Sequence, residues 1–136
     1  MRAAVLRAPG ELEIDDVEQP KCPPGGALIK VDACAVCPTD IKMVRRGQRD
    51  LVYPRILGHE VVGSIADIDG DLFSVGDRVQ VWPGISCGRC VSCLRGRDNM
   101  CSHQGIIGFN YDGGFAQYMA CLLYTSPSPR DRQKSR

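Results

Sequence analysis

The 136-residue sequence has no long apolar run, and it does not begin with a secretory leader. The missing apolar run argues against a membrane-spanning helix. Charged residues, among them Arg2, Arg7 and Glu11, interrupt the region where a signal peptide would carry its apolar core. We therefore expect a cytoplasmic protein with no membrane partner. In such a reducing compartment, clustered cysteines are more often metal ligands or catalysts than disulfides.

The sequence also has little net charge of either sign. Lysine and arginine number 17 against 16 acidic residues, for a net charge of +1. The last sixteen residues carry +3 of that charge, which leaves −2 for residues 1–120. Nucleic-acid binding requires a basic surface that neutralises phosphates. We therefore expect no nucleic-acid partner.

A third absence concerns dinucleotide binding. No G-x-G-x-x-G motif follows a predicted strand and opens a helix anywhere in the sequence. That motif forms the turn that holds the pyrophosphate of NAD or NADP in a Rossmann domain. The sequence therefore predicts that this chain contains no Rossmann domain.

Short apolar segments separated by Gly, Pro and Asp make up most of the chain. Their alternation and β-branched content predict strands at 2–8, 12–18, 27–36, 60–68, 75–83 and 113–121. Only 38–47 has helical spacing, with Thr39 or Asp40 as a cap and Gly47 as a stop. We predict a mainly β, barrel-like domain over 1–121. The Pro-, Ser- and Arg-rich segment 122–136 is expected to be a disordered or non-native tail.

Four cysteines lie close together at positions 87, 90, 93 and 101, in the pattern C-x-x-C-x-x-C-x7-C. Four thiolates can surround one tetrahedral zinc ion, and such a closed shell leaves no position for a substrate. This zinc would therefore be structural and would add to folding stability. An iron–sulfur cluster, disulfides and unliganded buried thiols remain open on spacing alone. The predicted ligands are Cys87, Cys90, Cys93 and Cys101.

A second, sparser set of polar residues could form an open metal site. Cys37 and His59 are each weak evidence alone, because a lone cysteine is usually a small buried apolar residue. Asp40 alone would usually be a helix cap. A cysteine and a histidine that share one ion with a free coordination position would, however, suit catalysis by a bound metal.

The motifs at these positions resemble those of the zinc-dependent medium-chain alcohol and polyol dehydrogenases. The segments ACAVCPTDIKMVRRG, GHEVVGSI, VGDRVQVWP and GGFAQYM and the four-cysteine loop have the order and spacing of that family's N-terminal domain. The resemblance covers residues 1 to about 120 and implies a GroES-like, partly open β-barrel with few short helices. It also implies a catalytic and a structural zinc, an alcohol or polyol substrate, and NAD or NADP bound mainly by a Rossmann domain beyond this chain. The full-length form would be a homo-oligomer.

The family mechanism can be carried over to five positions. Cys37 and His59 would be two of three protein ligands of the catalytic zinc, and the third would lie further along the full-length chain. Thr39 matches the residue whose hydroxyl carries the alcohol proton outward. Asp40 matches a carboxylate that holds the ligating histidine in its tautomer. Glu60 matches a carboxylate just behind the zinc.

Two other functions compete with this interpretation. A stand-alone zinc-binding module for structure or interaction would need only the four-cysteine loop. A dithiol oxidoreductase would use the C-x-x-C pair Cys34 and Cys37, and it would need a thiol with a lowered pKa.

Overall fold

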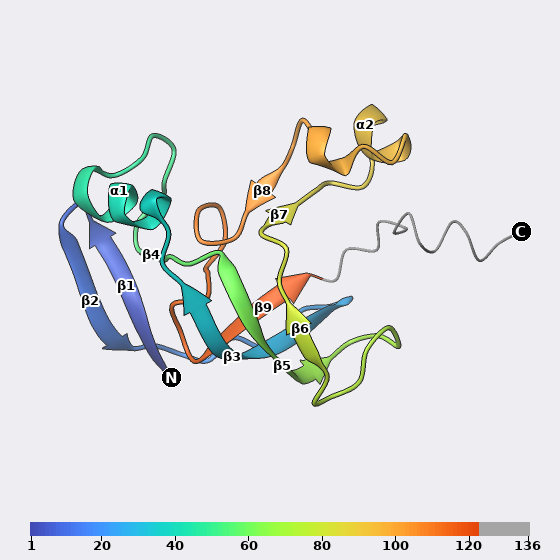
Figure 1. Ribbon diagram of the computed structural model, residues 1–136, viewed down its shortest axis with the longest axis horizontal. Coiled ribbons are helices and arrows are strands. Elements are labelled where there is room, and N and C mark those ends of the chain that lie inside the picture. Colours follow the sequence, from blue (N-terminus) through green and yellow to red (C-terminus); the bar gives the residue numbers. More distant parts are fainter. Residues whose placement is uncertain (123–136) are drawn as a thin grey trace, which may run out of the picture.

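The computed structural model describes residues 1–122, which form three small sheets with a few short helices (Figure 1). Apart from Leu122, the predicted tail at 122–136 lies outside the described residues. Along the chain the elements are β1 (Arg2–Ala8), β2 (Glu11–Asp16), β3 (Gly26–Ala35), α1 (Pro38–Arg46), β4 (Arg55–Ile56), β5 (Glu60–Ile68), β6 (Arg78–Gln80), β7 (Gly84–Ile85), α2 (Val91–Leu94), the 3-10 helix η1 (Asp98–Met100), β8 (Gly105–Ile106) and β9 (Tyr118–Leu122). None of the helices within this part of the chain could reach across a membrane.

The largest sheet has the strand order β6-β5-β3-β9, and all its pairs are antiparallel. β3 lies between β5 and β9, so Ile29 pairs with Ile65 on one side and with Met119 on the other. Apolar side chains from this sheet and from the neighbouring loops form one core cluster: Ile29, Val61, Val81, Ile107 and Met119. The long β3–β5 ladder is the main connection between distant parts of the sequence.

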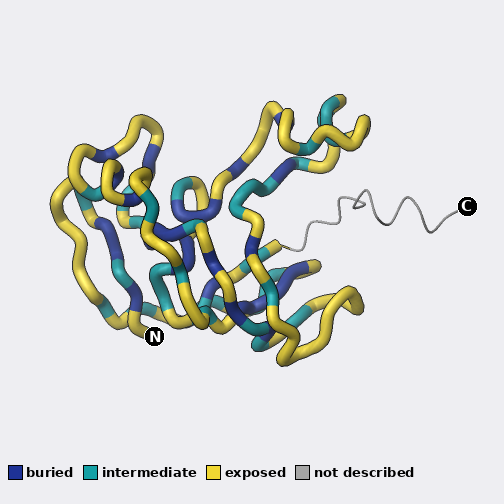
Figure 2. The backbone as a smooth tube through the Cα atoms, in the orientation of Figure 1, coloured by how far each residue is buried: buried dark blue, intermediate teal, exposed yellow. Residues whose placement is uncertain are grey.

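A smaller sheet of order β2-β1-β4 packs with α1 around a second core cluster, made by Leu6, Met43, Leu51 and Leu57. In Figure 2 the buried segments run between the two sheets, whereas β2 and the loop after β5 are largely exposed. The sheets do not join into a closed barrel through the strands described. The prediction of a mainly β, partly open fold with few short helices is confirmed.

Helix α1 ends as its sequence indicates, but it begins earlier than predicted: Cys37, and not Thr39 or Asp40, is the N-cap residue. Pro38 occupies the first helical position, where a missing N–H costs nothing. At the other end, Gly47 has φ +71° and donates its N–H to the carbonyl of Met43. Arg45 and Arg46 lie in the last turn, where positive charge is favourable.

Two predicted strands are shorter in the structure than the sequence indicates. Of the predicted strand 75–83, only Arg78–Gln80 pairs with a neighbour in the sheet. The strand predicted at 113–121 instead begins at Tyr118 and extends one residue further, as β9 (Tyr118–Leu122). The N–H groups of residues 113–115 donate instead to carbonyls of residues 56–58. A local pattern cannot reveal this, because the partner that removes the segment from the sheet is distant in sequence.

The buried leucine of the smaller sheet provides a test of core packing. Leu6 is fully buried, whereas its cross-strand partner Leu12 is 43% exposed. We expect Leu6→Ala to lower the free energy of unfolding by about 2–5 kcal/mol, because it leaves a cavity. Leu12→Ala should lower it by less than about 1 kcal/mol. Urea denaturation of both variants measures this, and equal losses would contradict the packing described.

Candidate metal centres

The pairing of β3 with β5 brings the first candidate site together. The ladder ends with Ala35 opposite Glu60, so Cys37 lies two residues beyond one strand and His59 one residue before the other. The Cys37 Sγ and the His59 Nε2 are 3.2 Å apart. Two residues that the sequence separates by 22 positions thus meet at one end of the two central strands.

Helix α1 fixes the cysteine of this pair. Cys37 is the N-cap residue, and its Sγ accepts a hydrogen bond from the backbone N–H of Thr39 at 3.3 Å. In return, the Asp40 Oδ2 accepts from the backbone N–H of Cys37 at 3.0 Å. This reciprocal capping holds the sulfur at the positive end of the helix dipole, where negative charge is favoured.

The same aspartate also faces the histidine. Asp40 is only 2% exposed, and its Oδ1 lies 3.5 Å from the His59 Nδ1. Within residues 1–122 this Oδ1 has no hydrogen-bond partner, although it is buried. A buried carboxylate oxygen normally has a partner. Its position suits a carboxylate that orients the imidazole through Nδ1 and leaves Nε2 directed at Cys37.

The donor set fits a zinc ion. One ligand atom from each of Cys37, Asp40 and His59 lies within 4.8 Å of the others. Zinc–sulfur and zinc–nitrogen bond lengths place a sulfur and a nitrogen of one tetrahedral site about 3.6 Å apart, and the pair here is at 3.2 Å. Thiolate and imidazole are typical zinc ligands.

Thr39 and Glu60, the other two predicted site residues, adjoin this group in sequence. Both are exposed, and Glu60 is not part of the group of close ligand atoms. Thr39 and Glu60 are thus exposed neighbours of Cys37 and His59 in the sequence, and their roles stay predictions.

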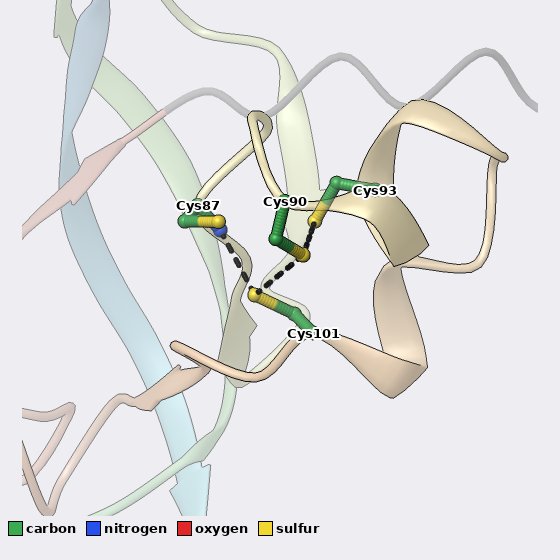
Figure 3. Close-up of side chains that lie close together, drawn as sticks. All are labelled: Cys87, Cys90, Cys93 and Cys101. Carbon is green, nitrogen blue, oxygen red and sulfur yellow. Dashed lines mark hydrogen bonds between the residues drawn. The ribbon is translucent and has the colours of Figure 1, made fainter.

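The second candidate site is the four-cysteine lobe, which projects from the body on the ribbon of β7 and β8 (Figure 1). The four sulfur atoms turn toward one another (Figure 3) and lie within 4.8 Å. The Cys90 Sγ is 3.5 Å from the Cys93 Sγ and 4.0 Å from the Cys101 Sγ. A tetrahedral zinc with bonds of about 2.3 Å would separate its sulfur ligands by about 3.8 Å. The lobe therefore fits one ion with a closed shell.

Backbone donors already favour thiolate in this lobe. Hydrogen bonds from the backbone of Cys93 and Ser102 lower the pKa of Cys90 to about 5. Hydrogen bonds from the backbone of Arg89 and Cys90 also lower the pKa of Cys87. Desolvation instead raises the pKa of Cys93 to about 12. Thiolates are the metal-binding form, so part of the shell is prepared before any ion arrives.

Two features of the sites are not evident from the sequence. The backbone N–H of His103 donates to the Cys101 Sγ at 3.3 Å, although its imidazole is exposed and joins neither group. Cys34 lies against the backbone just before His59, because a Cβ on Gly58 would be 2.8 Å from the Cys34 Sγ. Burial raises the pKa of Cys34 to about 11, whereas a reactive dithiol needs a lowered pKa.

Comparison with known proteins finds dehydrogenases that resemble this chain. The chain is 42% identical over 98 residues to D-altritol 5-dehydrogenase of Agrobacterium fabrum, which covers 71% of this chain and 29% of that protein. It is 40% identical over 124 residues to an alcohol dehydrogenase of Geobacillus stearothermophilus, covering 87% and 36%. A solved short chain alcohol dehydrogenase from Escherichia coli CFT073, complexed with NADH, superposes with a TM-score of 0.79 at 34% identity, covering 88% and 35%.

The chain therefore spans about a third of the length of the relatives it matches. Residues 23–124, three quarters of the chain, match the alcohol dehydrogenase GroES-like domain. This match includes both candidate metal centres and confirms the family predicted from the motifs. The chain belongs to the alcohol dehydrogenase GroES-like domain family.

Proposed function

We propose that this chain is the catalytic, metal-binding domain of a longer zinc-dependent dehydrogenase that transfers hydride from an alcohol or polyol to NAD or NADP. One observation carries the proposal: the Cys37 Sγ and the His59 Nε2 lie 3.2 Å apart with a buried carboxylate behind the ring. The names of the alcohol and D-altritol dehydrogenases among its relatives support the reaction and the substrate class.

Each residue of the site has a distinct part in this proposal. Cys37 and His59 would hold a zinc ion, which when bound acts as a Lewis acid on the alcohol oxygen. Asp40 keeps the imidazole oriented, since its carboxylate is buried beside Nδ1. The exposed hydroxyl of Thr39 would pass the alcohol proton outward, and Glu60 would assist exchange of ligands from its exposed position.

The remaining parts of the enzyme belong to the polypeptide outside this chain. We infer that it supplies the third ligand beside Cys37 and His59 and a Rossmann domain for NAD or NADP. Cys87, Cys90, Cys93 and Cys101 would bind a structural zinc. A cytoplasmic homo-oligomer is our expectation for the full-length protein, on the strength of the family resemblance.

A chimaeric enzyme tests the proposed function. Residues 1–122 would replace the matching segment of the Geobacillus stearothermophilus alcohol dehydrogenase, to which the chain is 40% identical. We expect the chimaera to oxidise alcohols with NAD or NADP. His59→Ala should lower kcat/KM by at least about 100-fold, because one ligand of the catalytic ion is lost. His103→Ala is the matched control, since this imidazole is exposed and joins neither candidate site.

Retained activity in the His59→Ala chimaera would refute the proposal. So would an inactive parent chimaera that folds and carries both zinc ions by mass spectrometry. The 136-residue chain alone should oxidise no alcohol, because it lacks the cofactor domain, and measurable NAD(P)-linked turnover would contradict that expectation.

Removal of the proposed structural zinc should lower the stability of the domain. Cys93→Ser should remove the tightly held zinc and lower the urea midpoint of unfolding, because binding free energy of a structural ion adds to folding stability. Cys22→Ser is the control, since Cys22 lies outside both groups of close ligand atoms. Zinc content by mass spectrometry and urea denaturation give the result. A Cys93→Ser protein with full zinc content would contradict the assignment.

The rival dithiol function predicts different chemistry at Cys34. Because burial raises the pKa of Cys34 to about 11, its thiolate is scarce at pH 8 and becomes abundant only above pH 11. We expect alkylation of Cys34 by iodoacetamide, followed by peptide mass spectrometry, to be slow at pH 8 and to accelerate as the pH rises toward 11. Fast alkylation at pH 8 would favour the dithiol function.

A further inference from the structure

The segment 112–115 lies directly against the segment 55–58 that leads into His59. The three carbonyl oxygens of residues 56–58 accept hydrogen bonds from the three N–H groups of residues 113–115, at 2.8, 3.0 and 2.9 Å in the order 56, 57, 58. The Asp112 Oδ1 adds a hydrogen bond from the backbone N–H of Ile56 at 3.1 Å. We call residues 112–115 the clamp. It engages each of the three residues before His59.

Glycine is required for this contact. A Cβ on Gly113 would lie 2.1 Å from the carbonyl oxygen of Gly58 and 2.5 Å from that of Leu57, which is far inside the van der Waals limit. Gly58 itself has φ +91°, a conformation that other residues adopt with strain. Its own Cβ would be 2.6 Å from the Phe115 ring. The two backbones therefore touch with no side chain between them.

The clamp is itself held from its other side. The carbonyl of Phe115 accepts a hydrogen bond from the N–H of Ala4 at 2.8 Å, and Ala116 bridges to Ala3. The Asp112 Oδ1 also binds the Arg55 guanidinium at 2.9 Å. The clamp thus connects β1 of the smaller sheet to the residues that precede β5. Movement of either partner would move the peptide next to His59.

We infer that the clamp is a positioning device for the candidate catalytic metal site. It sets the peptide of Gly58, and through it the direction in which His59 presents Nε2 to Cys37. Residues 112–115 contact the backbone of residues 56–58, which precede the candidate ligand His59, so they act only through its position. The effect on metal binding rests on the proposed function, whereas the effect on the imidazole itself does not.

The chain is well suited to a spectroscopic test because it has only two histidines, His59 and His103. Nitrogen-15 NMR of the imidazoles reports the tautomer of each ring without metal and the binding of zinc at each ring. In the parent chain we expect zinc to shift the His59 resonances and to leave those of His103 unchanged. Retention of zinc by the four-cysteine lobe is measured in parallel by mass spectrometry.

Gly113→Ala is the first variant. The added methyl must push the Gly58 peptide away by roughly 1 Å, so we expect altered His59 resonances without metal. We also expect zinc affinity at His59 to fall about 10- to 100-fold, as when a group that orients a ligand is lost. Gly26→Ala is the matched control: its Cβ would lie 2.6 Å from the Cys121 carbonyl, at the opposite end of β3.

Asp112→Ala provides a milder test, because the Asp112 side chain is 60% exposed and its loss creates no clash. It removes the acceptor for the Ile56 N–H, and we expect the His59 resonances to shift in the same direction as in Gly113→Ala. Asp112→Asn retains a side-chain oxygen at this position and should restore the parent spectrum. A general loss of stability would not produce this rescue.

The outcomes separate the two proposals. If Gly113→Ala and Asp112→Ala leave the His59 resonances and zinc affinity as in Gly26→Ala, the clamp is refuted. If zinc leaves the His59 resonances unchanged in both the parent chain and the chimaera, the proposed function fails, and the clamp is then judged on the metal-free resonances alone. The clamp is supported if the His59 resonances shift in Gly113→Ala and Asp112→Ala but not in Gly26→Ala, and if Asp112→Asn has the parent spectrum.

Discussion

The antiparallel ladder between β3 and β5 determines where the reactive side chains lie. It runs from Ala27 opposite Ile68 to Ala35 opposite Glu60. Of the two candidate zinc ligands, His59 comes one residue before Glu60 and Cys37 two residues after Ala35. A slip of one residue would move His59 by about 3.3 Å along the strand and reverse the faces of the strand's side chains. The apolar residues that fix the register, such as Ile29 and Val61, therefore contribute to the candidate metal site without being among its ligands.

The two candidate metal centres are assembled in different ways. The four cysteines come from fifteen consecutive residues, so local chain closure is enough to bring them together. Cys37 and His59 converge only after β3 and β5 pair, and the clamp reaches them from a segment some fifty residues further along. Non-local contacts of this kind are slow to form and depend on the complete fold. Cooperative folding of the body is thus a condition for the candidate site at Cys37 and His59.

Much of this arrangement could be predicted from the sequence because its signals are local. Alternating apolar residues indicated β3 and β5, and Gly47 indicated the end of α1, whereas the cap at its start is Cys37 and not the predicted Thr39 or Asp40. The conformation of residues 113–117 could not be predicted. Their N–H groups donate to carbonyls of residues 56–58 and of Arg2, which are distant in sequence. The strands β4, β7 and β8 were not predicted for a different reason: each has two residues, which is too short to show an alternation.

Asp40 has two contacts in the candidate site. The sequence offered two interpretations, a helix cap or a partner of the ligating histidine. In the structure one carboxylate oxygen accepts from the N–H of Cys37 and the other faces the His59 ring. One buried side chain thus ties the orientation of the imidazole to the start of α1, and the two interpretations are parts of a single arrangement.

The ribbon of β7 and β8 has an evolutionary consequence. Ile85 pairs with Gly105. This pair holds together the two ends of the loop that contains the four cysteines. The entropy of closing such a loop changes only slowly with its length. Descendant lineages could therefore lengthen the lobe, or discard it for a tight turn, while inheriting the rest of the domain unaltered.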